Sequence, residues 1–268
     1  MTPVVRPTLE MERRLWRAGH RWVAGVDEVG RGAWAGPLSV GVAVVHAGLR
    51  TRSIPEWLRD SKSLSEERRE DVFDRVANWC ADAAVGHVTP DECDRYGMTL
   101  AWRLAAYRAL AALEVRPDAI VLDGPWDLLR GPRAKAAAAS PEEAAAGATG
   151  AIDVPLFDVP QFDVDEPAVD PALPPRDTDP PLPAVTVPET VLPTVRADAT
   201  CAAVAAASVL AKVVRDRWMR AEAEHFPAYG FERNKGYPSP HHQIALRGYG
   251  LSAIHRRSWA YVADLPWR

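Results

Sequence analysis

The sequence predicts an α/β fold with helices on a mixed central sheet, a C-terminal helical part and one long insertion. Short runs rich in β-branched residues dominate the first half of the chain, and segments with helical spacing alternate with them and then take over. The composition, 47% hydrophobic and 25% charged over 268 residues, is that of a globular protein. Three scattered cysteines exclude a disulfide framework and a cysteine-based zinc site.

Each element follows from a local pattern. Valine-rich apolar runs predict strands, and apolar residues that recur at three- and four-residue spacing predict helices. Ser65 followed by Glu66 and Glu67 is a capping sequence, so we expect a helix from there to about Trp79. The other expected strands are 21–27, 38–45, 83–88 and 119–122, and the other expected helices are 99–113, 199–221 and 242–247.

Residues 126–193 differ from the rest of the chain. They contain 13 of the 24 prolines, and 12 acidic residues against four basic ones. The segment has no helical period and too much proline for a central strand. We therefore expect a disordered acidic insertion, 126–193, between the two parts of a single domain, 1–125 and 194–268.

The net charge of −4 hides an asymmetry along the chain. Without the insertion the chain carries a net charge of +4, and residues 194–268 alone carry +5. The overall balance therefore does not argue against a polyanionic partner. No apolar run reaches the roughly 18 residues of a membrane span, and the N-terminus is charged where a signal peptide is apolar. We expect a cytoplasmic protein with no membrane partner.

Two adjacent carboxylates, Asp27 and Glu28, end the first expected strand. Like charges repel, and partial burial disfavours ionisation, so such a pair is costly unless a divalent metal offsets the cost. The alternative is a solvated strand end before a glycine turn. The buried strand before the acids and the paired glycines after them favour a site, because they put the acids at a rigid edge.

The segment Gly30-Arg31-Gly32 follows directly and invites a dinucleotide interpretation. The next glycine is Gly36, however, and Pro37 with a β-branched run follows where the dinucleotide fold needs a helix. We reject that interpretation. Small residues here instead allow the backbone to approach a sugar or a phosphate closely.

Two further acids lie at element boundaries. Asp123 ends an expected buried strand, where open α/β sheets bind ligands, although an Asp before glycine also forms turns. Asp198 precedes the long helix, where an N-cap is the alternative. With Asp27 and Glu28 these acids form a set of hard oxygen ligands. Such a set suits Mn²⁺ or Mg²⁺ and the two-metal hydrolysis of a phosphodiester.

Other catalytic patterns are not found in the sequence. There is no G-x-S-x-G elbow, and Ser208 and Lys212 have the spacing S-x-x-x-K rather than S-x-x-K. The histidines His241, His242 and His255 lack the i, i+4 spacing of a helical metal site, so we interpret them as surface or phosphate-facing residues.

Six segments, in order, resemble the bacterial ribonuclease HII family. They are DEVGRG at 27–32, DSKSLS at 60–65, LDG at 122–124, RAD at 196–198 leading into AAASVLAKVVRD, NKGY at 234–237 and IHRRSW at 254–259. The resemblance covers nearly the whole chain outside 126–193. It implies a ribonuclease H-like fold and endonucleolytic cleavage of RNA in RNA–DNA hybrids, including single ribonucleotides embedded in duplex DNA.

The resemblance also implies roles by position. The implied catalytic, metal-binding residues are Asp27, Glu28, Asp123 and Asp198. The implied substrate-binding residues are Gly30, Arg31, Gly32, Lys62, Lys235 and Tyr237. The glycine–arginine–glycine turn would contact the ribose 2′-OH and the adjacent phosphate, the tyrosine would pack on the junction sugar, and the lysines would hold phosphates. Such contacts distinguish RNA from DNA without reading the bases.

The chain departs from the family pattern between its third and fourth acids. A short connection joins them in the family, whereas 74 residues lie between Asp123 and Asp198 here. Loop-closure entropy grows slowly with length, so the fold can absorb this insertion. A smaller departure is Ser239, where the family commonly has threonine. We assign Asp216 a structural role, or one behind the catalytic acids.

The leading hypothesis is a monomeric, metal-dependent endoribonuclease whose partners are RNA–DNA hybrids and ribonucleotide-containing duplex DNA. It would cleave on the 5′ side of a ribonucleotide and leave 3′-hydroxyl and 5′-phosphate ends. The alternative is a catalytically inactive nucleic-acid-binding protein of the same fold, and the intact set of acids argues against it.

Overall fold

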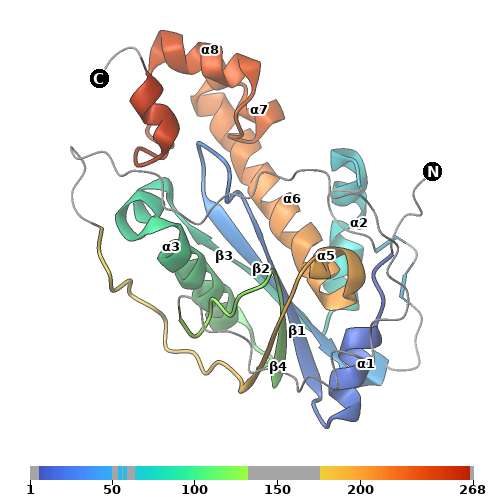
Figure 1. The fold of residues 1–268 in the computed structure, drawn as a ribbon. Helices are drawn as coiled ribbons and strands as arrows, with labels where there is room; N and C mark the ends of the chain where they lie inside the picture. The colour runs from blue at the N-terminus through green and yellow to red at the C-terminus, as the bar shows by residue number, and fades with distance from the viewer. Residues whose placement is uncertain (1–5, 50–53, 56, 59–63, 132–175, 266–268) are drawn as a thin grey trace, which may run out of the picture.

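A five-stranded mixed sheet forms the centre of the computed structural model, which describes residues 6–49, 54–55, 57–58, 64–131 and 176–265 (Figure 1). The strand order is β3-β2-β1-β4-β5. β1 pairs antiparallel with β2 and parallel with β4, which confirms the predicted mixed sheet. The strands are β1 (Trp22–Val29), β2 (Leu38–His46), β3 (Asp82–Val88), β4 (Ala119–Asp123) and β5 (Thr190–Thr194).

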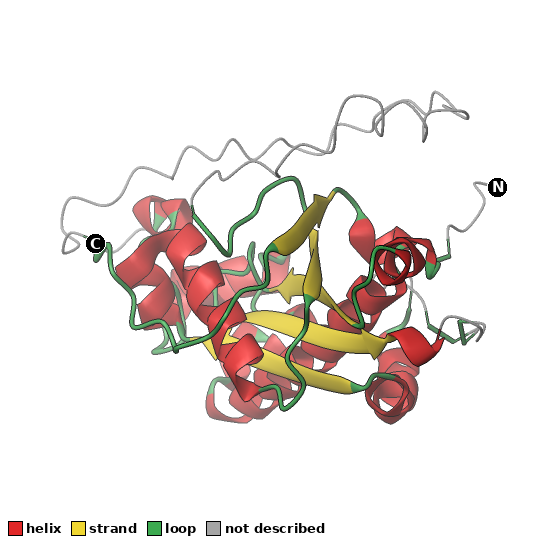
Figure 2. Cartoon of the chain, turned by 90° about the horizontal axis from the view of Figure 1, so that it is seen from below, coloured by secondary structure: helices red, strands yellow, loops and turns green. Residues whose placement is uncertain are grey.

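Helices cover both faces of this sheet (Figure 2). The α-helices are α1 (Glu10–Arg17), α2 (Glu66–Trp79), α3 (Pro90–Ala112), α5 (Ala197–Thr200), α6 (Ala202–His225), α7 (Phe231–Asn234) and α8 (Pro240–Tyr249). The 3₁₀ turns are η1 (Ala47–Leu49), η3 (Pro227–Tyr229) and η4 (Ala260–Asp264). The apolar side chains of α1, α2 and α6 pack on one face, and those of α3 pack on the other. No helix among the described residues has the length and apolarity that crossing a membrane requires.

The alternation of side chains along β1 determines which helix each residue meets. Val23 belongs to the apolar cluster under α6, whereas Val26 belongs to the cluster under α3. Gly25 lets α6 approach closely, because a Cβ there would lie 2.1 Å from the carbonyl carbon of Ala203. The same alternation puts Asp27 on the α6 face and Glu28 on the α3 face.

The C-terminal elements η3, α7, α8 and η4 form a separate apolar cluster with the end of α6, beyond the end of the sheet at which β1 finishes (Figure 1). Phe231, Met219 and Ala35 are fully buried in this cluster. Ala35 belongs to the β1–β2 connection, so the C-terminal part packs directly against that loop.

Three element boundaries differ from the expectation. α3 begins at Pro90 rather than at residue 99, because Thr89 and Glu92 form a capping box and the helix continues past a kink at Gly97 (φ 72°). The expected helix 199–221 is two helices, α5 and α6, which meet at Cys201.

The third difference concerns the expected insertion 126–193. Residues 190–193 of that segment belong to β5, which pairs in parallel with β4 at the edge of the sheet. An edge strand tolerates Pro193, because only one of its sides must pair. Leu129 is also 1% exposed and packs in the α3-side cluster. Residues 132–175 lie outside the described part of the chain.

Candidate active site

All four predicted acids lie at one end of the sheet. β1 and β4 run side by side, and Val26 is paired with Leu122, so Asp27 and Asp123 are the next residues on the two strands. Both belong to the α6 side of the sheet. Oδ1 of Asp123 accepts a hydrogen bond of 2.7 Å from the backbone N–H of Ala197, the first residue of α5. This bond brings α5, and with it Asp198, to the same edge. We call Asp27, Glu28, Asp123 and Asp198 the acid edge.

Glu28 is held on the opposite side of β1. Its Oε2 accepts a hydrogen bond of 3.1 Å from the indole N–H of Trp102 on α3, and its Oε1 lies 3.7 Å from the guanidinium of Arg31. The carboxylate therefore has partners away from the other three acids. Trp102 was not singled out in the sequence, because nothing local marks it as a partner of residue 28.

The structure does not support the alternative interpretation of Asp198 as an N-cap of the long helix. The N-cap of α6 is Cys201, so Asp198 does not cap that helix. Asp198 instead lies in the short helix α5, which follows Arg196 in a left-handed conformation (φ 60°). It is 5% exposed, as is Asp27. Two carboxylates are thus nearly buried at the acid edge.

The donor chemistry of the acid edge suits a hard divalent cation, because all four residues offer only oxygen. Among the residues that the structure describes, however, no three or more Asp, Glu, His or Cys side chains are grouped so that they could hold a metal ion as placed.

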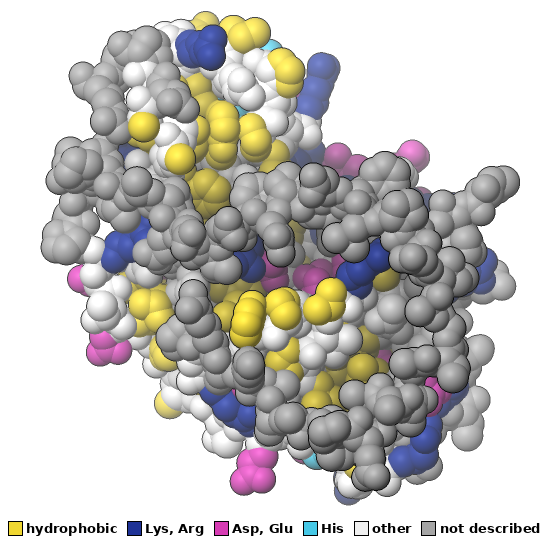
Figure 3. All heavy atoms as spheres, in the orientation of Figure 1, with side chains coloured by type: hydrophobic (Ala, Val, Ile, Leu, Met, Phe, Trp, Pro, Cys, Tyr) yellow, Lys and Arg dark blue, Asp and Glu magenta, His cyan; other side chains and the backbone are white. Residues whose placement is uncertain are grey.

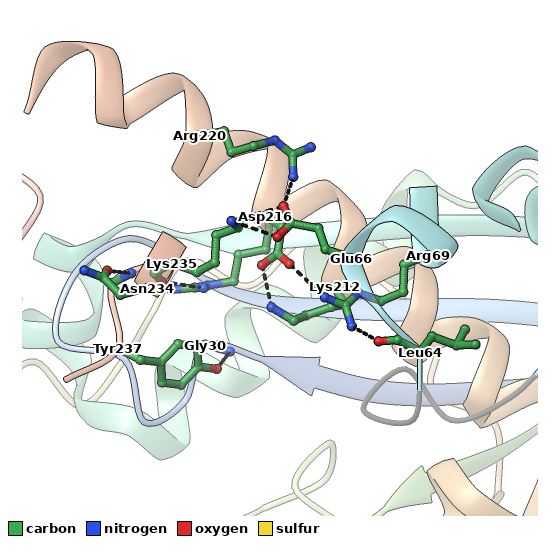
Figure 4. Close-up of polar contacts among 12 residues, drawn as sticks. Gly30, Leu64, Glu66, Arg69, Lys212, Asp216, Arg220, Asn234, Lys235 and Tyr237 are labelled. Carbon is green, nitrogen blue, oxygen red and sulfur yellow. Dashed lines mark hydrogen bonds and ion pairs between the residues drawn. The ribbon is translucent and has the colours of Figure 1, made fainter. Parts of the chain in front are cut away.

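The loop after the acid edge, residues 30–37, is called here the glycine loop. Gly30 has φ +88°, and its N–H donates a hydrogen bond of 3.1 Å to the phenol oxygen of Tyr237, 207 residues away in the chain. The N–H groups of Trp34 and Ala35 both donate to the carbonyl of Gly236, at 2.8 and 3.2 Å. The structure therefore brings two of the predicted substrate-binding segments into contact (Figure 4).

The remaining predicted contacts differ in their surroundings. The Arg31 side chain is 48% exposed, and a Cβ on Gly32 would meet no atom within 4 Å. Lys235, in contrast, has a side chain only 5% exposed, which pairs with Glu66 at 3.0 Å. Lys62 lies outside the described residues.

Asp216 occupies a structural position behind the site. It is 2% exposed and forms ion pairs with Lys212 on its own helix (2.6 Å) and with Arg69 on α2 (3.5 Å) (Figure 4). Its carboxylate thus ties α2 to α6. This placement agrees with the structural role assigned from the sequence.

Two histidines contradict their interpretation as surface or phosphate-facing residues. His242 and His255 are fully buried, and their Nε2 atoms lie 2.9 Å apart. Nδ1 of His242 lies 2.9 Å from the carbonyl oxygen of Tyr237. Burial lowers the pKa of His242, and burial followed by the charges of His242 and Arg257 lowers the pKa of His255 to about 3. The two imidazoles are therefore neutral, and His242 holds the backbone of Tyr237 in place through its carbonyl oxygen.

Acidic and basic side chains lie near one another on one face of the molecule. In Figure 3, Asp and Glu side chains gather in the hollow between the C-terminal part and the body of the molecule, with Lys and Arg side chains on either side. Such an arrangement places cations where the backbone of a polyanion would run past the carboxylates.

Comparisons with known proteins agree with this geometry. The chain matches the family model for ribonuclease HII over residues 24–138 and 156–262. It is 39% identical over 268 residues to ribonuclease HII of Streptomyces avermitilis, covering 99% of this chain and 89% of that protein. It is 36% identical over 258 residues to ribonuclease HII of Thermus thermophilus, covering 96% of this chain and 95% of that protein.

A solved structure extends the likeness to the fold. The crystal structure of ribonuclease H2 from Pyrococcus horikoshii OT3 matches with a TM-score of 0.59 and 28% identity, over 91% of this chain and 96% of that one. The family match includes residues 126–138 and 156–193 of the expected insertion, so only 139–155 lie outside it between the two matched parts. The chain belongs to the ribonuclease HII family and is an endoribonuclease that acts on RNA–DNA hybrids.

Proposed function

We propose that this enzyme hydrolyses the phosphodiester on the 5′ side of a ribonucleotide, in hybrids and at single ribonucleotides embedded in duplex DNA. The products carry 3′-hydroxyl and 5′-phosphate ends. One observation carries the proposal. β1 leads from Asp27 and Glu28 directly to Gly30, and Tyr237 binds the amide of Gly30 from the C-terminal part. Asp27 and Glu28 therefore lie within three residues of the first residue of the loop that would recognise the ribose.

The acid edge would hold the Mn²⁺ or Mg²⁺ ions. Bound ions would activate water and stabilise the leaving oxygen. Asp27 and Asp123 are fixed by the ends of two adjacent strands, and Asp198 by the turn that Asp123 anchors. Glu28 would join them by releasing the indole N–H of Trp102 and the guanidinium of Arg31 in favour of the divalent cation.

The glycine loop and Tyr237 would distinguish the ribose from a deoxyribose. A 2′-OH both donates and accepts hydrogen bonds, so main-chain groups suffice to recognise it. Gly32 leaves the space beside it open, so that a sugar can approach the backbone. Arg31 is exposed beside it and can meet the adjacent phosphate. None of these contacts involves a base, so cleavage should be independent of sequence.

The proposal is tested on a duplex with one ribonucleotide and on a long hybrid, each with Mg²⁺, with Mn²⁺ and with EDTA. We expect cleavage with either ion, none with EDTA, and product ends that map to the 5′ side of the ribonucleotide. Asp27→Asn should reduce the rate at least about 100-fold, because an amide is a much weaker metal ligand. Its far-ultraviolet spectrum and melting temperature should be retained.

Asp118→Asn is the matched control. Asp118 accepts backbone N–H bonds at the other ends of β1 and β4 (2.8 and 3.1 Å), so the substitution alters the same strands away from the acid edge. It should leave the rate nearly unchanged. Full activity of Asp27→Asn would contradict the metal assignment, and cleavage on the 3′ side would contradict the proposed reaction. A wild-type chain that binds both duplexes but cleaves neither would favour the inactive binding protein instead.

A further inference from the structure

Two buried arginines lie beneath the glycine loop. Arg215 belongs to α6 and Arg256 follows α8, and both side chains are fully buried. Within the described part of the chain neither forms an ion pair with a carboxylate. Burial of a guanidinium is costly unless its N–H groups donate hydrogen bonds. The hydrogen-bond acceptors of these two side chains therefore indicate which segments the arginines hold in place.

Arg215 binds only main-chain oxygens. Its Nε donates to the carbonyl of Pro37 (2.9 Å), its Nη1 to that of Lys235 (2.9 Å), and its Nη2 to that of Ala35 (3.1 Å). Its guanidinium also lies 5.4 Å from the ring centroid of Tyr237. One side chain thus joins the end of the glycine loop to the segment that carries Tyr237.

Arg215 also constrains the beginning of the loop. A Cβ on Gly30 would lie 2.2 Å from Nε of Arg215, so the guanidinium fills the place of a side chain at that position. Burial lowers the pKa of Arg215 to about 10, which leaves it a cation at neutral pH. The carbonyl oxygens and the ring of Tyr237 compensate that charge.

Arg256 holds the same loop from the other side. Its Nη1 donates to the carbonyl of Arg31 (3.0 Å) and its Nη2 to that of Gly36 (3.1 Å), while its own backbone N–H donates to that of Trp34 (2.9 Å). Its guanidinium therefore ties the first residues of the loop to the last ones.

We propose that Arg215 and Arg256 are positioning residues, a two-arginine clamp that sets the path of the glycine loop and thereby its discrimination between ribose and deoxyribose. This inference rests on the proposed function of the loop. The planar guanidinium presents N–H donors at fixed angles on three nitrogens, whereas the ammonium of a lysine presents three freely rotating donors on one nitrogen and cannot reach carbonyls on opposite sides. Because recognition of one hydroxyl depends on ångström-scale placement, small shifts of the loop should strongly reduce both the cleavage rate and the discrimination between ribose and deoxyribose.

The experiment compares Arg215→Lys and Arg256→Lys with a matched control, Arg108→Lys. Arg108 on α3 also donates to a main-chain carbonyl, that of His87 (2.7 Å), and pairs with Glu92, but it does not bind the glycine loop. Three quantities are measured: kcat and KM on a duplex with one ribonucleotide, the ratio of affinities for that duplex and an all-DNA duplex in EDTA, and amide hydrogen exchange of peptides that cover residues 30–37.

We expect each clamp variant to lose about 10- to 100-fold in kcat/KM, to move the affinity ratio toward one, and to exchange faster in residues 30–37. Arg108→Lys should change none of the three. If Arg215→Lys does not fold, the same three measurements on Arg256→Lys test the proposal. That substitution removes hydrogen bonds to fewer carbonyls, so it should disturb folding less.

Folded clamp variants with the affinity ratio and exchange of the wild type would overturn the inference. An equal loss in the clamp and control variants would also overturn it, since that result indicates a merely structural role. Failure of the proposed function is distinguishable. In that case the wild type does not prefer the ribonucleotide duplex, while exchange in residues 30–37 still rises in the clamp variants.

Discussion

The acid edge and the glycine loop are neighbours on β1, yet different parts of the molecule hold them in place. The acid edge depends on strand ends, where the parallel pairing of β1 and β4 sets Asp27 beside Asp123. The glycine loop depends on side chains outside the sheet, chiefly Arg215 of α6 and Arg256 after α8, which bind its carbonyl oxygens. In the proposed function, the hydrolysis would therefore depend on residues that the sheet positions, and the recognition of the ribose on a contact between distant parts of the chain.

This difference predicts how each region responds to change. A carboxylate at a strand end can be replaced by its amide with little effect on packing, so the acid edge should lose activity and keep stability. The glycine loop covers two buried cations, and disturbing it leaves their N–H groups without partners. Changes in the loop should therefore reduce stability and activity together.

The largest effect is expected for Gly30→Ala compared with Gly32→Ala. A Cβ on Gly30 would lie 2.2 Å from Nε of Arg215 and 2.7 Å from the carbonyl oxygen of Pro37, at φ +88°. We expect a loss of about 2–4 kcal/mol in the free energy of unfolding, from overpacking and left-handed strain together. Urea unfolding measures it, and the cleavage rate should fall with it.

Gly32→Ala separates recognition from stability. Its Cβ would meet no atom within 4 Å, so the free energy of unfolding should change by less than about 1 kcal/mol. KM for a ribonucleotide-containing duplex should nevertheless rise, because the methyl group occupies the space where the sugar approaches. Equal destabilisation by the two substitutions would show that the loop is not held in the manner described.

The next effect is a dependence of stability on pH through His242 and His255. The N–H of Ser252 donates to Nδ1 of His255 (2.9 Å), so His255 carries its proton on Nε2, toward Nε2 of His242 (2.9 Å). Burial lowers the pKa of His255 to about 3, so the unfolded chain binds more protons than the folded one as the pH falls from 6.5 toward 3. The free energy of unfolding should therefore be at its maximum above pH 6.5. Below that pH it should fall by about 1.4 kcal/mol per pH unit.

His255→Gln tests this assignment. It should flatten the slope of the free energy of unfolding between about pH 6.5 and pH 4.5, because it removes the titrating ring. Replacement of the exposed His225 by Gln is the control and should leave the slope unchanged. An unchanged slope in His255→Gln would mean that other groups produce the acid sensitivity.

Much of the sheet and of the acid edge could be predicted from the sequence, because their signals are local. Valine-rich runs indicated β1 and β2, and an acid that ends each of two parallel strands indicated the edge. β5 was missed because Pro193 and its proline-rich surroundings do not read as a strand, although an edge strand tolerates one proline. The opposite placement of Glu28 follows from strand alternation, but its partner Trp102 does not.

The clamp and the histidine pair could not be predicted, because no local pattern carries them. Arg215 binds a carbonyl 178 residues away, and Arg256 binds one 225 residues away. A buried arginine in an alanine-rich helix and a histidine near the C-terminus look like surface residues until the chain is folded. The sequence motifs that contain these residues indicated the family, but the residues that they contact are visible only in the folded structure.

The smallest effect concerns Lys235, which borders the glycine loop but is paired with Glu66 (3.0 Å). If Lys235 binds a phosphate, Glu66→Gln should release it, tightening duplex binding about two- to fivefold at low salt and steepening the salt dependence by about one unit. Stability should fall by less than about 1 kcal/mol.

Glu70→Gln is the control for this last effect. It removes the same charge from the same helix, but Glu70 pairs with Arg217 (2.6 Å) and Arg220 rather than with Lys235. Any gain common to both variants reflects the lost negative charge alone, because both lie on the first two turns of α2. Only a larger gain in Glu66→Gln would show that Lys235 joins the substrate contacts. Equal gains would leave it as a purely structural cation that supports the glycine loop from the C-terminal side.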